Sequence, residues 1–268
     1  MTAFSAVAAQ FARDTASHEM TVKHEDGLYR HLKFMNPEHG SFGAFELITW
    51  PYNLVVKTGW TFHFDIDATE DMFDLFRRTA RTARTGEINP SYWSEKVRAG
   101  RDEVEGFNPD LLKAEIASTI AQWMRDDLEP RVYAWAKNVG FTPSELRERP
   151  GIRRELARQV SPQWRAANRE LREAVQEHFF GDMADYNVEY ESEAHRALHD
   201  FSYRPEGATT EYGYYFADWH EWRLKDFTPG FLHSCYAIRH GIDVYDAASK
   251  STGSAISPVV TAAEAVTS

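Results

Sequence analysis

The stretch AFELITWPYNLVVKTGWTFHFDI, residues 44–66, alternates short runs of β-branched and aromatic residues with the turn formers Pro51 and Gly59. This pattern is typical of antiparallel strands joined by tight turns. Residues 20–35 have the same texture, so the sequence predicts four or five antiparallel strands between about residues 20 and 66. The connections are too short for helical crossovers, and a meander is therefore the expected topology.

Helical patterns come before and after the expected strands in the sequence. Residues 3–17 have an apolar stripe, and residues 67–84 form an amphipathic pattern that begins with Asp67 and Glu70, spaced as in a capping box. From residue 108 to about residue 200, helical patterns alternate with prolines and glycines. We therefore expect an α+β fold, with a small N-terminal antiparallel meander sheet packed by helices and a mainly helical half after it.

The second helical pattern also has a basic side, formed by Arg77, Arg81 and Arg84. These arginines form either a solvated helix surface, which we favour, or a site for an acidic ligand.

The chain divides into three expected regions. Residues 1–100 form the sheet-and-helix region, residues 101–248 form a mainly helical region packed on it, and residues 249–268 form a flexible tail. A single domain for the first two regions is the alternative. The last helix is expected to begin at Thr228 and Pro229, and its apolar face is expected to be buried. That face consists of Phe231, Cys235, Ile238, Ile242 and Tyr245.

Composition limits the classes of function. The chain has 268 residues, a formal net charge of -11 and 43% hydrophobic residues, so it can build a core but repels polyanions unless its charge is segregated. A protein partner is therefore expected, and nucleic acid and membranes are not. The single cysteine excludes an intramolecular disulfide, no apolar run could span a membrane, and the N-terminus lacks the basic residues of a signal peptide. The expected location is the cytoplasm.

The sequence contains few candidates for catalytic or metal-binding groups. His195 and His199 have the spacing of two zinc ligands on a helix, but Arg196 stands where a metalloprotease has its glutamate. Cys235 lies on the apolar face of the last helix and is expected to be a buried structural thiol. We expect no metal and no cofactor, and the sequence favours a non-enzymatic protein while leaving an enzyme open.

The segment FADWHEWRLKDF, residues 216–227, supports three interpretations. Packing of the two tryptophans against other helices is the favoured one. The second is a hot spot for a partner protein, because tryptophan and arginine dominate such sites, and the third is a reaction centre. The partner-binding residues would be Trp219, His220, Trp222 and Arg223.

Five stretches of the chain occur in a characteristic order. They are DGLYRHLKF (26–34), FELITWP (45–51), EDMFDLFR (70–77), INPSYWSEKVRA (88–99) and FTPGFLHSCYAIRHGIDVYD (227–246). Together they resemble a family of uncharacterised proteins from tailed phages and prophages, over roughly residues 18–112 and 195–246. The resemblance implies a phage genome and a bacterial host cytoplasm, and it implies no activity, cofactor or catalytic residue.

Three functions are compatible with these observations. The leading one is a phage accessory protein that binds a host or phage protein, for instance to interfere with host defence or replication. The alternative is a small-molecule or nucleotide-binding protein, or an enzyme, with a pocket at the sheet. That pocket would be lined by His31, Trp50, Trp60 and His63. The third is a virion assembly protein, and the oligomeric state stays open.

Overall fold

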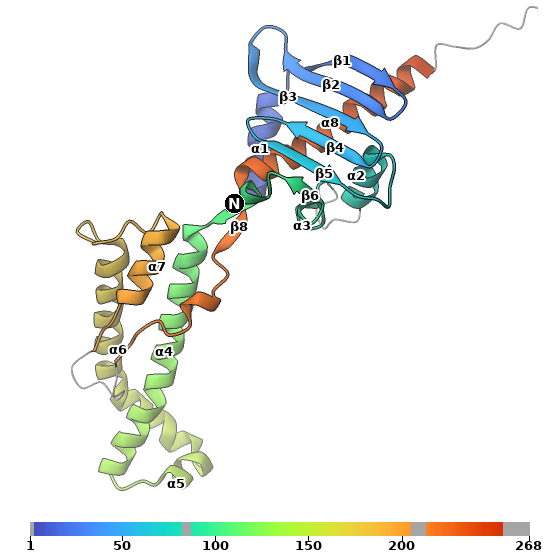
Figure 1. Cartoon of the computed structure of the whole chain (residues 1–268). Helices are drawn as coiled ribbons and strands as arrows, with labels where there is room; N and C mark the ends of the chain where they lie inside the picture. Colours follow the sequence, from blue (N-terminus) through green and yellow to red (C-terminus); the bar gives the residue numbers. More distant parts are fainter. Residues whose placement is uncertain (1–2, 82–86, 205–212, 254–268) are drawn as a thin grey trace, which may run out of the picture. The chain divides into compact units, whose positions relative to one another are not determined.

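Five antiparallel strands lie between residues 19 and 65, as a meander, in the computed structural model of the chain (Figure 1). They are β1 (Glu19–Asp26), β2 (Tyr29–Asn36), β3 (Gly40–Trp50), β4 (Asn53–Lys57) and β5 (Thr61–Asp65). A sixth strand, β6 (Val97–Ala99), pairs with β5 and was not expected from the sequence. The structure describes residues 3–81, 87–204 and 213–253. The α+β class and the meander topology are thus confirmed.

The chain forms two units. Unit 1 comprises residues 1–106 and 227–268, and unit 2 comprises residues 107–226. Unit 2 is therefore an insertion within the chain of unit 1. The chain passes from unit 1 to unit 2 in strand β7 (Glu105–Phe107) and returns to unit 1 in strand β8 (Lys225–Phe227). These two short strands pair with each other.

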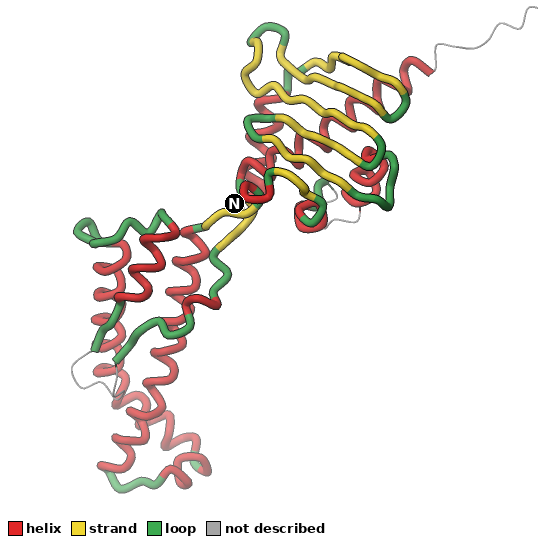
Figure 2. Tube along the Cα trace, in the orientation of Figure 1, coloured by secondary structure: helices red, strands yellow, loops and turns green. Residues whose placement is uncertain are grey.

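The helices of unit 1 cover one face of its sheet. They are α1 (Ala3–Thr15), α2 (Met72–Arg81), the short α3 (Pro90–Ser94) and α8 (Pro229–Gly253), with a 3-10 turn η1 at Arg101–Glu103. Figure 2 shows α8 running behind the strands. In β2 to β5, alternate residues face these helices, and the apolar ones among them with no exposed surface are Leu32, Phe34, Leu47, Leu54, Val56, Phe62 and Phe64. Period-two alternation of apolar residues thus places one sheet face in the core.

Helix α8 passes close to the sheet. Thr228 Oγ1 accepts a hydrogen bond from the backbone N–H of Phe231 at 3.1 Å, which confirms the expected cap. The expected apolar face is buried from Phe231 to Ile242, and Tyr245 is partly buried. A Cβ at Gly241 would lie 2.5 Å from Leu47 Cδ1, so only glycine allows this approach of helix to sheet.

The start of α2 differs from the expected one. Asp71 Oδ1 accepts a hydrogen bond from Phe73 N at 2.9 Å, so Asp71 caps the helix, and the expected capping box of Asp67 and Glu70 is wrong. Asp71 also accepts two hydrogen bonds from Arg30, at 3.0 and 3.1 Å. The long-range partner on β2 selects the capping carboxylate, and the local spacing of acidic residues does not contain that information.

Unit 2 is helical. Its helices are α4 (Pro109–Asn138), α5 (Pro143–Glu148), α6 (Pro150–Phe180) and α7 (Glu191–Asp200), with a 3-10 turn η2 at Trp219–Glu221. Two apolar clusters line α4 and α6. One lies at the C-terminal end of α4 and the N-terminal part of α6 with α5, and the other includes α7 and the residues around η2. None of the helices within the described residues has both the length and the apolar character needed to cross a membrane.

The division of the chain differs from the expected one in two respects. The last helix is expected in a helical region of residues 101–248, whereas α8 belongs to unit 1 with the sheet. Periodicity shows that a helix face is buried but does not show what buries it. The expected tail of residues 249–268 begins too early, because α8 continues to Gly253 through a segment without a helix breaker. Residues 254–268 lie outside the described residues.

Candidate functional site

The second face of the unit 1 sheet is not covered by any described element of that unit (Figure 1). Facing residues of neighbouring strands form three rows across it. The rows are His31, Ile48, Val55 and His63; Lys33, Glu46 and Lys57; and Trp50, Asn53 and Asp65. We call these ten residues the open face. Nine of them are partly exposed and Lys57 is exposed, as expected for a flat sheet surface covered only by its own neighbours.

A fixed aromatic pair lies at one corner of the open face. The rings of Trp50 and His63 are stacked, with centroids 5.5 Å apart and an interplanar angle of 27°. Asn53 Nδ2 donates to the carbonyl oxygen of Pro51 at 2.9 Å, which directs Asn53 Oδ1 toward His63 Nε2 at 2.7 Å. Because an amide oxygen only accepts, the proton of neutral His63 is on Nε2, and Nδ1 is left as an acceptor.

The turn beside this pair holds an unusual backbone conformation. Tyr52 has φ of 68°, and it is the only described non-glycine residue with a positive φ. Its N–H donates to Glu70 O at 2.9 Å, and its carbonyl accepts from Ile66 N at 3.1 Å. Such a conformation costs about 1 kcal/mol or more and persists because the surroundings impose it. The turn therefore fixes the positions of Trp50 and Asn53 on either side of it.

A charged row crosses the other part of the open face. His31 Nε2 and Glu46 Oε2 are 3.0 Å apart. This hydrogen bond is the main cause of the lowered pKa of the Glu46 carboxyl, and the charges of Lys57 and Lys33 on the neighbouring strands lower the pKa further. Glu46 is thus held in its ionised form between two lysines, an alternation of charge that also stabilises strand pairing.

Three of the four residues expected to line a pocket at the sheet share the open face: His31, Trp50 and His63. Trp60 does not, and the expected four-residue pocket is wrong in that respect. The Trp60 ring lies against the first turn of α8, where a Cβ at Gly230 would be 2.5 Å from it. Trp60 is in the turn between β4 and β5, so strand alternation does not specify its side.

Asn53 belongs to this face and is not among the residues expected from the sequence. Its signal is present in NLVVK, where period two puts Asn53, Val55 and Lys57 on one side of the strand. The signal becomes informative only with the strand register, which places Asn53 beside Trp50.

The tryptophans of residues 216–227 pack within unit 2. The Trp219 ring lies 4.9 Å from the His195 ring, and the Trp222 ring contacts the Phe216 ring edge-on at 5.4 Å. Both tryptophans are partly buried against an apolar cluster, whereas His220 and Arg223 are exposed. Packing thus accounts for the two tryptophans, and a role of Trp219, His220, Trp222 and Arg223 in partner binding stays a prediction.

The arginines expected on the basic side of α2 and the histidine with the spacing of a zinc ligand are considered next. Arg77 donates from Nε and Nη2 to Asp246, at 2.9 and 2.6 Å, and it also pairs with Asp74. Two carboxylates neutralise this arginine, and Arg84 lies outside the described residues. His199 Nδ1 lies 2.7 Å from Asp200 Oδ1. Within the described ranges, no group of three or more histidine, cysteine, aspartate or glutamate side chains is arranged to hold a metal ion.

Comparison with protein families, with curated proteins and with solved structures finds no match to this chain.

Proposed function

We propose that this chain is a phage-encoded accessory protein that acts by binding another protein through the open face of unit 1. One observation carries the proposal: no described element of unit 1 covers this sheet surface, and charged residues flank its aliphatic ones. Ile48 and Val55 face each other on the two middle strands, and Lys33, Glu46, Lys57 and Asp65 lie in the rows on either side of them. Protein interfaces have this arrangement of apolar centre and polar rim.

The aromatic corner of the open face supports the same function. Trp50 is held by the His63 ring and by a fixed turn, so little side-chain freedom is lost when a partner covers it. Rigid aromatic side chains are enriched among the residues that contribute most to binding. The alternative, a small-molecule or nucleotide pocket, has less support because Trp60 lies on the other side of the sheet.

The class of partner protein is inferred from the sequence. The resemblance to tailed-phage proteins favours a host or phage protein in the bacterial cytoplasm, with interference in host defence or replication as one form of the function. A role in virion assembly is the other form, and detection of the chain in purified particles would distinguish it.

A crosslinking experiment tests the open face directly. We would introduce the photo-crosslinking residue benzoylphenylalanine at Val55 in the full chain, in host cells, with the same residue at Val139 as the control. Val139 is 46% exposed and lies in unit 2. We expect a specific adduct from position 55 alone. The same adducts from both positions, or none from position 55, would overturn the proposal.

Binding to the purified adduct partner then provides the quantitative test. Because Val55 is at the centre of the open face, we expect Val55→Lys to weaken binding about 10-fold or more, and Val139→Lys to leave it unchanged. Native mass spectrometry at several protein concentrations gives the other outcome. A dimer that Val55→Lys abolishes would show that a second copy of the chain covers this face, in place of a different protein.

A further inference from the structure

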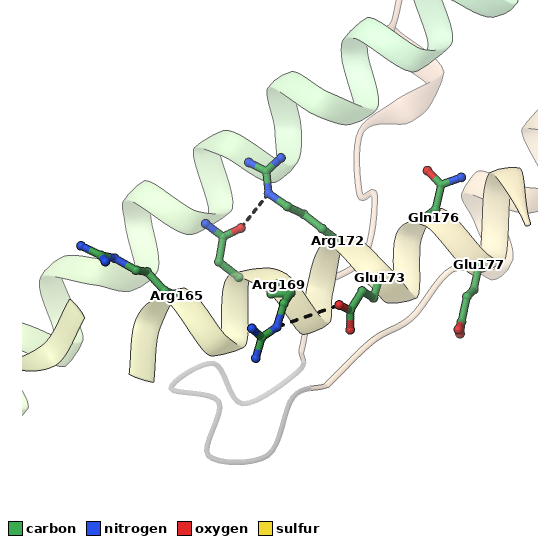
Figure 3. Close-up of a pocket in the computed structure, with 7 residues that line it drawn as sticks. Arg165, Arg169, Arg172, Glu173, Gln176 and Glu177 are labelled. Carbon is green, nitrogen blue, oxygen red and sulfur yellow. Dashed lines mark hydrogen bonds and ion pairs between the residues drawn. The ribbon is translucent and has the colours of Figure 1, made fainter. Parts of the chain in front are cut away.

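Five arginines lie along one exposed face of α6 in unit 2. They are Arg154, Arg158, Arg165, Arg169 and Arg172, and all five are exposed. At 100° per residue they fall within about 60° of the helix circumference, and they extend over roughly 27 Å of its axis. We call them the arginine stripe. Figure 3 shows its C-terminal half, with Arg165, Arg169 and Arg172 projecting from the helix.

The arginine stripe belongs to a segment whose charge is opposite to that of the chain. Residues 147–172 contain eight arginines and three glutamates, with no lysine or aspartate. The remainder of the chain has 38 acidic and 22 basic residues. The charge is therefore segregated along the sequence, and segregation is the condition under which an acidic protein can still bind a polyanion.

The opposite side of α6 is packed in the unit. Leu156, Val160, Ala167 and Leu171 are buried there, whereas the arginine stripe is exposed. Between and beside the arginines lie the small or polar residues Ser161, Pro162, Asn168 and Gln176, together with the carboxylates of Glu155 and Glu173.

The present contacts of the stripe are weak ones. Arg158 pairs with Glu155 at 3.1 Å and Arg169 with Glu173 at 3.9 Å, and their side chains are 78% and 71% exposed. Exposed pairs of this kind contribute about 0–1 kcal/mol, so a phosphate can replace the carboxylate. Arg172 Nε donates to Asn168 Oδ1 at 2.9 Å. A shallow groove of about 650 Å³ runs along this half of the helix beside these side chains.

We propose that the arginine stripe binds the phosphate backbone of a nucleic-acid duplex. Guanidinium groups match phosphate oxygens with two parallel hydrogen bonds, and amide and hydroxyl groups like those beside the stripe also contact phosphates. At 1.5 Å per residue the stripe is as long as about eight base pairs.

Two other partners fit the stripe less well. A single strand would be held by aromatic rings that stack on its bases, and none of the stripe positions is aromatic. A protein surface would need an apolar anchor, and the stripe residues and their polar neighbours supply none. The net charge of -11 averages over a basic helix face and an acidic remainder, so it does not by itself exclude a polyanion as partner.

The test measures binding of the full chain to a fluorescent 20-base-pair DNA duplex of arbitrary sequence, by anisotropy, between 50 and 200 mM salt. The variant combines Arg158→Gln, Arg165→Gln and Arg169→Gln. If each arginine neutralises one phosphate, the variant should lose about 10- to 100-fold in affinity, and the slope of log K against log salt should fall by about 2.7. The same strand without its complement is measured in parallel.

A matched control removes the same charge from other surfaces of unit 2. It combines Arg125→Gln, Lys137→Gln and Arg196→Gln, at three exposed positions off the stripe. We expect the control to retain wild-type affinity within about threefold. Equal losses in both variants, no duplex binding by the wild-type chain at 50 mM salt, or tighter binding of the single strand would each overturn the proposal. The open face lies in the other unit, so the result leaves the proposed function untouched.

Discussion

The two units of the chain bury their apolar residues in different ways. Unit 1 closes one core between a sheet face and helices from both ends of the sequence, and Phe34, Phe62 and Phe231 have no exposed surface. Unit 2 has two smaller clusters along a pair of long helices. The first arrangement depends on partners that are distant in sequence. Substitutions that separate such partners should therefore have the largest effects.

Removal of a large core side chain in unit 1 gives the largest expected effect. Phe231 on α8 packs edge-on against Phe62 of β5, with ring centroids 5.3 Å apart. We expect Phe231→Ala to lower the free energy of unfolding by about 3–5 kcal/mol, because it leaves a cavity between helix and sheet. Urea unfolding monitored by hydrogen exchange would locate the loss in residues 1–106 and 227–253. A loss of the same size in unit 2 would show that the two cores are not separate.

A buried ion pair gives the next largest effect. Arg30 is 9% exposed and donates two hydrogen bonds to Asp71, which also caps α2. We expect Asp71→Ala to cost about 3 kcal/mol, because it removes the cap and leaves a buried guanidinium without its carboxylate. The midpoint of urea unfolding measures this loss. Asp71→Asn, which retains the cap but not the charge, should lose less, and an equal loss would contradict the role of the cap.

Acidification should destabilise unit 1 by a smaller amount. Burial lowers the pKa of His233 and of His240, and the nearby Asp14 and Asp243 offset this only in part. The unfolded chain, with histidine pKa near 6.5, then binds more protons than the folded chain in mildly acidic solution. The stability contributed by neutral histidine is complete above about pH 7, and it is lost progressively as the pH falls below about 6.5 toward the lower pKa of the folded state.

The pH prediction is checked by urea unfolding at pH 7.5 and 5.5. Both histidine rings lie against the ring of Phe11 on α1, at 5.0 and 5.7 Å, so α1 should lose hydrogen-exchange protection first. His240→Gln removes one of the two groups and should reduce the pH dependence. An unchanged pH dependence in that variant would exclude His240 as a source.

An exposed ion pair in unit 2 gives the smallest expected effect. Arg153 and Glu129 are 2.9 Å apart, and their side chains are 52% and 53% exposed. We expect Arg153→Ala to change stability by no more than about 0.5 kcal/mol, because solvent screens the pair. The same urea titration as for Asp71→Ala applies. A loss as large as that of Asp71→Ala would show that burial does not explain the difference between the two pairs.

The local features of unit 1 are visible in its sequence, whereas its long-range partners are not. Strands β1 to β5 are predicted because alternation and turn residues are properties of neighbouring positions. Strand β6 has three residues, too few for a pattern, and the burial of α8 against Leu47 depends on a close approach at Gly241. The pairing of β6 and the packing of α8 are therefore known only from the three-dimensional structure.

The same distinction applies to the candidate site. His31, Trp50 and His63 lie within strands, so a common face follows once the register is known. Trp60 lies in a turn, where no periodicity fixes the side chain, and its contact with the first turn of α8 involves residues 170 positions away. The arginines of α6 are visible in the sequence, but neither the net charge nor the mixture of arginine and glutamate shows how the charges are distributed over the helix face.

The insertion of unit 2 within unit 1 also determines the order in which the protein can be completed during translation. The sheet leaves the ribosome early, but α8, which closes its core, is made only after all of residues 107–226. At 5–20 residues per second this interval is on the order of 10 seconds. During that time α8 does not yet cover the apolar face of the sheet, while unit 2 can already fold. A nascent chain that stops before residue 229 would thus contain a complete unit 2 and a unit 1 without α8.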